Sequence, residues 1–321
     1  MHRHSIGSSV KPQIYTVLTT INTCALAALA AVSAASAQSN VTLYGSIDAG
    51  YSNKQNRAGG SDTAFGGELT KSNRIGFKGT EDLGGGLKAL FVLETGFNSG
   101  SETPTSLGDR GAFVGLQGGF GTVTMGSSQL TPSFYAMAAT NPTAADNFGL
   151  KNYAGASRFD NSVNYMSPTI LGGLVLRGAM VQKADNGGNN NANDVSAIYA
   201  NGPLTLAASA SDNGFDKGTA VGGAYNFGMF EVFAGSTETP NTTTAATSTK
   251  YNHIGASLPV NSALVLAADY QTSKVQATNV KVNSTVLSAQ YSLSKRTYVS
   301  AYTKKAQRID AEYGISLIHS F

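Results

Sequence analysis

Short segments in which apolar and polar residues alternate recur along almost the whole chain, and this pattern restricts the fold more than any other feature. Residues 41–51 place Val41, Leu43 and Ile47 on one face and Asp48 on the other. A period of two is typical of a β-strand with one apolar face. After the first 37 residues no segment approaches 18 uninterrupted apolar residues, so the sequence predicts no membrane-spanning helix.

Sixteen segments of this kind follow residue 37. They begin near Val41, Lys71, Gly86, Asp109, Phe120, Arg158, Gly173, Ala192, Pro203, Lys217, Met229, Lys250, Ser262, Lys281, Arg296 and Ala311. Residues 38–321 then provide roughly 18 residues for each strand with its connection, and a tilted membrane strand needs about 9–11 of them. We therefore predict an all-β fold, a sixteen-stranded antiparallel transmembrane β-barrel.

The predicted connections alternate between short and long. The short ones are residues 82–86, 117–119, 201–203, 226–228 and 258–261, and the long polar ones are residues 53–70, 98–108, 129–157, 183–191 and 238–249. Short periplasmic turns and long extracellular loops are typical of outer-membrane barrels. The glycine-rich turn at 82–86 is followed by no helix, so we interpret it as a strand connection and not as a phosphate-binding loop.

Charged residues indicate which face meets the lipid. Seven charged residues fall on the less apolar face of their predicted strands: Asp48, Lys78, Lys88, Glu94, Asp160, Arg177 and Asp269. A charge in the middle of the lipid face costs about 2–4 kcal/mol, so these side chains are expected inside the barrel. The strands of a soluble β-sandwich also alternate between apolar and polar residues. The strand number, a secretory signal in the first 37 residues and the final aromatic residue, Phe321, favour a membrane barrel instead.

The first 37 residues have the features of a secretory signal. Arg3 and Lys11 precede an apolar run of roughly residues 17–32, and we expect cleavage after Ala37. The chain that remains is then expected in the cell outer membrane. The apolar run is too short and too interrupted for a membrane anchor. Cys24, the single cysteine, lies inside this leader. The remaining chain has 20 basic and 19 acidic residues, which gives no reason to expect a nucleic-acid partner.

Five stretches carry a family resemblance: residues 41–48, 72–97, 112–124 and 158–168 and the terminal residues 313–321. With them the chain resembles the trimeric general porins of Gram-negative outer membranes, of the branch found in Neisseria and Burkholderia relatives. The resemblance implies a single porin β-barrel domain over residues 38–321, a water-filled pore and a homotrimer. It also implies that the third long loop, Gln129–Ser157, folds into the barrel and narrows it.

The resemblance further implies a constriction in which basic side chains face acids. By matching position we assign Arg74, Arg158 and Glu94 to it, with Asp146 as the loop acid. Arg110 fits a motif of the family, but its parity matches the outward Ala112, so both locations stay open. Asp48 and Arg177 are predicted to face the lumen from parity alone. Where relatives often carry arginine, this chain has Ser127, which weakens the argument for strong anion selectivity.

The sequence gives little reason to predict a catalytic site. His253 and His319 are the histidines outside the leader, and neither is accompanied by a second histidine or a close carboxylate cluster. Because metal and triad chemistry need such groups, we predict no enzyme, no metal and no cofactor. We predict a general-diffusion porin for small solutes and ions. A solute-specific channel of the same fold and a surface-binding barrel are the alternatives. Expected partners are outer-membrane lipids, lipopolysaccharide and the assembly machinery, which reads Phe321.

Overall fold

The computed structural model describes residues 40–56, 60–100, 105–141, 154–182, 191–212, 217–239, 248–307 and 311–321. The predicted leader, its cleavage site and the predicted loop acid Asp146 lie outside these ranges. In the part of the chain that the structure describes, no helix combines the length and the apolar character needed to cross a membrane.

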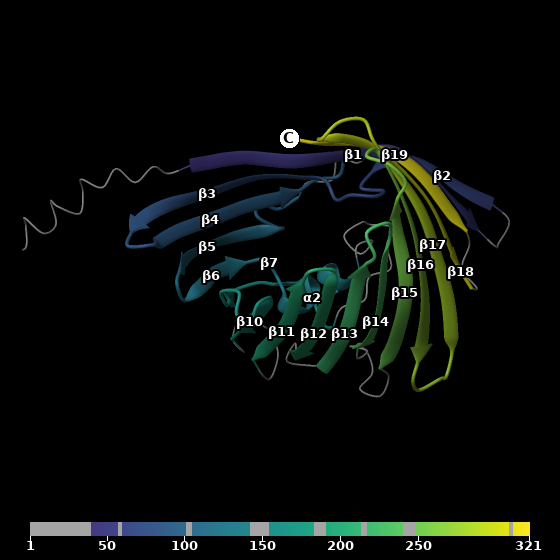
Figure 1. Cartoon of the computed structure of the whole chain (residues 1–321). Coiled ribbons are helices and arrows are strands. Elements are labelled where there is room, and N and C mark those ends of the chain that lie inside the picture. Colours follow the sequence, from purple (N-terminus) through teal and green to yellow (C-terminus); the bar gives the residue numbers. More distant parts are fainter. Residues whose placement is uncertain are drawn as a thin grey trace, which may run out of the picture.

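Sixteen antiparallel strands form a closed barrel (Figure 1). In chain order they are β1 (Asn40–Asn56), β3 (Arg74–Gly84), β4 (Leu87–Gly96), β5 (Gly111–Gly118), β6 (Gly121–Ser127), β9 (Ser162–Met166), β10 (Leu174–Val181), β11 (Ala192–Asn201), β12 (Leu204–Asp212), β13 (Lys217–Asn226), β14 (Glu231–Thr239), β15 (Thr249–Pro259), β16 (Leu264–Val275), β17 (Lys281–Ser292), β18 (Thr297–Ala306) and β19 (Glu312–Ser320). β19 pairs with β1 and closes the ring, with His319 opposite Ile47. The predicted fold class and strand number are confirmed.

The two faces of the wall differ as the alternation predicts. On β1, Val41 is 62% exposed and Leu43 52%, whereas Asp48 is fully buried. On β19, Leu317 is 51% exposed and its neighbour Ile318 is fully buried. A belt of exposed apolar side chains around a closed barrel is the surface that lipid covers. The side of each strand can therefore be assigned from the sequence.

The turn between β3 and β4 explains the glycine cluster at its centre. Gly84, Gly85 and Gly86 have φ angles of 84°, 61° and 81°. Other residues adopt this left-handed region only with strain. The turn therefore sets the register of the hairpin, in which Asp82 pairs with Lys88, and it holds no site of its own.

The connection after β1 differs from the prediction. The sequence predicts one long loop over residues 53–70, but residues Gly60–Gly67 form strand β2, which pairs with β1 from Asn56 back to Ala49. Phe65 is the only large apolar residue in β2, so the strand has no apolar face that a pattern could reveal. Its backbone pairs with the long edge of β1 instead. The ring centroids of Phe65 and Tyr51 lie 5.3 Å apart.

The third long loop begins and ends in a small two-stranded sheet. β7 (Gln129–Leu130) pairs with β8 (Arg158–Phe159). The sequence predicts that Arg158 starts a barrel strand, but the barrel strand β9 begins at Ser162. Arg158 therefore belongs to the end of the loop, where two hydrogen-bonded chain segments fix its position.

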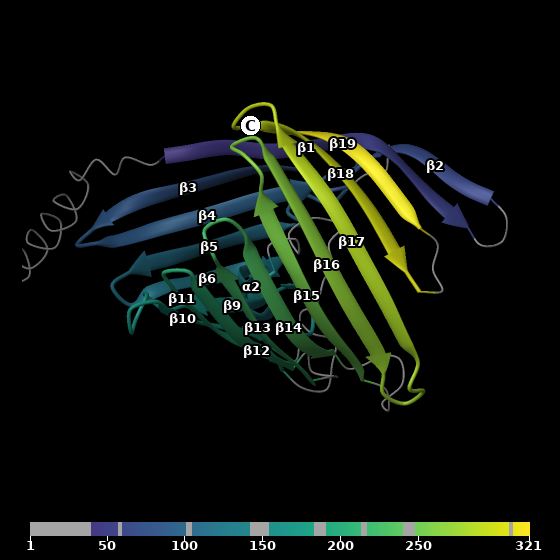
Figure 2. The same ribbon diagram turned by 45° about the vertical axis from the view of Figure 1, so that its right-hand side comes forward.

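Helix α2 (Pro132–Thr140) belongs to this loop and enters the barrel. It lies inside the ring of strands, between β3–β6 and β12–β14 (Figures 1 and 2). Thr131 caps its start, because the Thr131 hydroxyl accepts a hydrogen bond from the Phe134 amide at 3.3 Å. A Cβ on Gly222 of β13 would lie 2.5 Å from the Thr140 hydroxyl. The inner surface of β13 that faces the helix must therefore carry small residues. The predicted inward fold of the loop is confirmed for its described residues.

A pair of charge insertions on β17 would test the assignment of faces. Leu287, 50% exposed on the outer face, is near the middle of its strand, and Leu287→Arg is expected to destabilise the barrel in lipid by about 2–4 kcal/mol. The matched variant Ser288→Arg points to the lumen, where water solvates it, and a much smaller change is expected. Urea unfolding in lipid vesicles measures both. Equal losses would contradict the assignment.

Candidate pore constriction

A cavity of about 410 Å³ lies between α2 and the wall formed by β3–β10. Four arginines and one carboxylate line it: Arg74, Arg110, Arg158, Arg177 and Glu94. Arg74, Arg158 and Glu94 are residues that the resemblance assigns to the constriction. Arg110 is the residue whose location stayed open, and Arg177 is the one that parity alone places in the lumen. The structure brings all five together. Their role in narrowing the pore stays a prediction.

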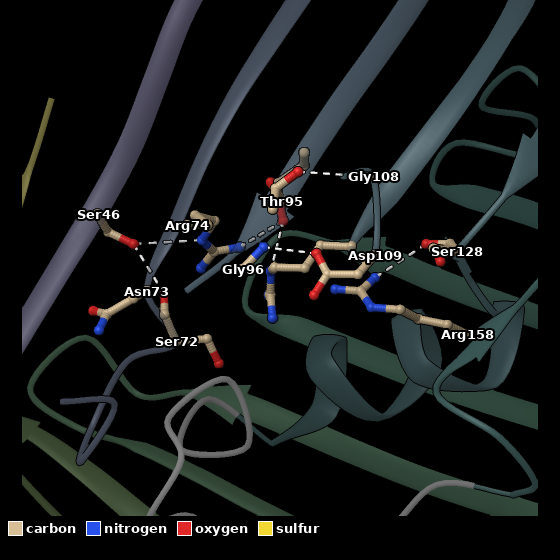
Figure 3. Close-up of polar contacts among 12 residues, drawn as sticks. Ser46, Ser72, Asn73, Arg74, Thr95, Gly96, Gly108, Asp109, Ser128 and Arg158 are labelled. Atoms are coloured by element: carbon tan, nitrogen blue, oxygen red, sulfur yellow. Dashed lines mark hydrogen bonds and ion pairs between the residues drawn. The ribbon is translucent and has the colours of Figure 1, made fainter. Parts of the chain in front are cut away.

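Arg74 and Glu94 meet because of the β3–β4 register. Arg74 pairs with Gly96, and Gly76 pairs with Glu94, so the two charged side chains lie one step apart on the inner face. Arg74 Nη1 lies 3.8 Å from Glu94 Oε1. Arg74 Nε also donates to the Ser46 hydroxyl at 3.4 Å, as Figure 3 shows. Arg74 and Glu94 are twenty positions apart, and the hairpin between them returns the carboxylate to the height of the guanidinium.

Tyr44 completes the environment of Glu94. Its hydroxyl donates to Glu94 Oε2 at 2.9 Å. The ring lies over Gly76, where a Cβ would be 2.7 Å from the ring atom Cζ. A side chain at position 76 would therefore displace the Tyr44 ring from this place. The sequence pattern does not reveal Tyr44, because an inward tyrosine looks like any other lumen residue.

Arg110 lies on the inside. Its Nε donates to Glu94 Oε1 at 2.9 Å, and its backbone amide donates to the Glu94 carbonyl at 3.2 Å. If the alternation of β5 continued backwards from Ala112, Arg110 would lie on the outer face. This inference is wrong. Arg110 belongs to the turn before Gly111, and turn residues do not follow the pleat of the strand.

Arg158 and Arg177 have a different environment. Arg158 Nη1 donates to the Ser128 carbonyl at 3.4 Å (Figure 3). The guanidinium of Arg177 stacks over the Tyr135 ring, 3.9 Å from its centroid. Neither has a carboxylate partner among the residues that the structure describes. Because Glu94 binds Arg74 and Arg110, the other two guanidiniums carry charge that these contacts leave uncompensated.

Figure 3 shows two of these arginines, Arg74 and Arg158. Arg74 enters from the β3 side and Arg158 from the loop side, and their guanidinium groups point toward one another. Asp109 does not join them, since its Oδ1 accepts a hydrogen bond from the Gly96 amide at 2.7 Å. This contact fixes the turn that carries Arg110.

Asp48 has a role that parity could not indicate. It lies on the inner face of β1, but its side chain is fully buried. Its Oδ2 accepts hydrogen bonds from the Thr70 amide at 2.7 Å, the Thr70 hydroxyl at 2.9 Å and the Lys71 amide at 2.6 Å. The carboxylate thus anchors the segment between β2 and β3 to the wall, next to Arg74.

The sequence analysis also missed the groups that hold α2. At the start of the helix, Asp194 of β11 accepts from the Ser133 amide at 2.7 Å and the Ser133 hydroxyl at 2.9 Å. At its end, Asn141 donates to Asp269 Oδ2 at 3.4 Å and lies 3.4 Å from His253 Nδ1. These partners come from strands far away in sequence, so no local motif connects them to the helix.

His253 has one carboxylate neighbour, which its own sequence neighbourhood does not indicate. Its Nδ1 lies 4.0 Å from Asp269 Oδ1, because β15 and β16 place the two residues diagonally across a pair. Both side chains are buried against the end of α2. Among the described residues, no group of three or more histidine, cysteine or acidic side chains could hold a metal ion. The arrangement is that of an anchor for the loop.

Comparison with known proteins agrees with the geometry. The model of the Gram-negative porin family matches residues 25–308 of the chain. The chain belongs to the Gram-negative porin family. Its members are outer-membrane porins, so this porin lies in the outer membrane with its barrel enclosing a channel.

Individual relatives support the assignment over different lengths. Outer membrane porin protein 32 of Delftia acidovorans is 32% identical over 304 residues, which cover 81% of this chain and 82% of that protein. Major outer membrane protein P.IB of Neisseria gonorrhoeae is 47% identical over 94 residues, 28% of this porin and 27% of that protein. The solved anion-selective porin from Comamonas acidovorans is similar in fold, with a TM-score of 0.78, 23% identity and coverage of 88% and 100%.

Proposed function

We propose that this porin is a general-diffusion channel for small hydrophilic solutes and ions that prefers anions. The observation that carries the proposal is the charge around the cavity, where four arginines accompany Glu94 as the one carboxylate among the described lining residues. Fixed charges of one sign in a narrow pore concentrate ions of the opposite sign and repel the others. The proposed activity needs no catalytic residue, metal or cofactor.

Recordings from the purified protein in a planar bilayer test this function. In a gradient of potassium chloride, the reversal potential is expected to have the sign of chloride permeation. A potential of zero or of the opposite sign would contradict the anion preference. Conductance that rises in proportion to salt supports general diffusion, whereas saturable block by one solute supports the alternative of a solute-specific channel.

We also propose that three copies assemble in the outer membrane, in contact with lipid and lipopolysaccharide. A porin of similar fold, OmpT of Vibrio cholerae, has been solved in a trimer form, with a TM-score of 0.67. The exposed apolar belt supplies surface that either lipid or a second copy can cover. Native mass spectrometry from detergent is expected to give the mass of three chains, and a monomer alone would contradict the proposal.

We propose that the outer-membrane assembly machinery recognises Phe321. The residue also has a structural contact, since its backbone exchanges hydrogen bonds of 3.1 and 3.2 Å with Gly45. Phe321→Ala keeps these bonds and removes the ring. We expect it to lower the yield of folded porin in cells several-fold and to leave refolding in detergent nearly unchanged. Phe321→Tyr keeps an aromatic ring and should retain the yield. An unchanged yield for Phe321→Ala would exclude the recognition role.

A further inference from the structure

Part of the wall of the constriction cavity is apolar, whereas the inside of a water-filled pore is ordinarily polar. On β4, residues 89–93 are apolar on both faces. Leu90 and Val92 point inward, and Phe113 of β5 pairs with Val92 across the strands. All three line the cavity with the arginines. Lipid contact explains the outward residues of β4, but it does not explain these inward ones.

The third loop contributes a second apolar surface to the same cavity. Leu130, Pro132 and Tyr135 line it from the loop side. The inner wall and the loop therefore enclose a space with apolar groups on two sides. Because the side chains of Val92 and Phe113 are only partly buried, the loop does not cover them completely.

Cationic groups lie beside this apolar surface. Arg177 stacks on Tyr135, and its Nε is buried without a hydrogen-bond partner among the described residues. The positive charges of Arg158 and Arg177 both line the cavity and favour an anion inside it. A simple inorganic anion pairs with these charges but leaves the apolar wall in contact with water.

We infer that the constriction cavity binds organic anions with an apolar body, of which aromatic monocarboxylates are the simplest. This inference rests on the proposed anion preference and names the solute class that the same site favours. The carboxylate faces Arg158 and Arg177, and the ring lies against Val92 and Phe113. Removing on the order of 60 Å² of ring surface from water favours binding about tenfold over a polar anion.

Block of the chloride current by added solutes tests the inference. Benzoate is the probe, gluconate and acetate are the polar anions, and benzamide is the neutral ring. The half-blocking concentration of benzoate is expected to be about tenfold below that of gluconate. Acetate should block as weakly as gluconate, and benzamide should have no effect. Equal block by all three anions would overturn the inference.

Two variants assign the effect to the wall. Val92→Thr keeps the side-chain shape and the pore charge, so it should weaken block by benzoate several-fold, while the reversal potential in potassium chloride keeps its anion sign. The matched control Val114→Thr alters an outward residue, 63% exposed, and should leave the block unchanged. Phe113→Ser is a stronger test of the same wall, and Val92→Thr decides the matter if that variant fails to assemble.

The two possible failures differ in their results. If the wild-type reversal potential has no anion sign, the proposed anion preference fails. If the anion sign is present and benzoate blocks no better than gluconate, or Val92→Thr blocks as the wild type does, only the inference about apolar anions fails.

Discussion

Replacing Arg158 and Arg177 together by glutamine is expected to weaken the anion preference of the channel strongly. These two guanidiniums lack a carboxylate partner in the described part of the chain, so their charges act on passing ions. One unit charge at about 4 Å changes an ion's energy by about 1 kcal/mol even in bulk water, and by more beside low-dielectric walls. The effect has opposite signs for anions and cations, so the permeability ratio should fall at least roughly tenfold.

The reversal potential in a potassium chloride gradient measures this change. The matched control is Lys78→Gln with Lys88→Gln, which also removes two positive charges from the inner face of β3 and β4 but leaves the cavity lining intact. The control should shift the potential far less. If both double variants shift it equally, the net charge of the lumen sets the selectivity and the arginine cavity has no special role.

Replacing Asp194 by alanine is expected to release α2 from the barrel wall. Asp194 Oδ1 holds both the amide and the hydroxyl of Ser133, and the carboxylate is fully buried. Leaving a buried donor unpaired costs about 1–3 kcal/mol. Such a loss raises the detached fraction of the loop roughly ten- to a hundredfold. Single-channel records should then show frequent transitions to states of higher conductance.

Asp194→Asn is the matched control for this prediction. An asparagine keeps an oxygen acceptor for Ser133, so its records should lie between those of the wild type and Asp194→Ala. The barrel itself should be unaffected, and heat-dependent migration in gels checks this. A steady wild-type conductance in Asp194→Ala would mean that two other features hold the loop without Asp194. These are the contacts of Asn141 and the packing of α2 against small residues of β13.

Several features of the constriction could be anticipated from the residues. Arg74 and Glu94 lie on the inward parity of neighbouring strands, and a turn at residues 82–86 returns the chain to the same height. Their ion pair of 3.8 Å follows from hairpin geometry alone. The outward and inward faces of β1 and β19 are equally local, because each side chain's direction depends only on its place in its own strand.

Other features depended on information that is absent from any one segment. Arg110 was ambiguous because the turn before β5 breaks the alternation. Strand β2 was missed because its stability comes from the edge of β1 and not from an apolar face of its own. The link between Asp194 and Ser133 joins residues 61 positions apart, and nothing in either neighbourhood indicates it.

The sequence by itself determined the barrel, its strand number and the side that each strand shows to lipid. These follow from a period of two repeated sixteen times, since a reversed strand would place charges in hydrocarbon. Only the tertiary structure decided which charges share a cavity, how the third loop lies across the pore and which walls are apolar. Those contacts depend on register between strands and on small residues that admit the helix, and both arise only when the ring has closed.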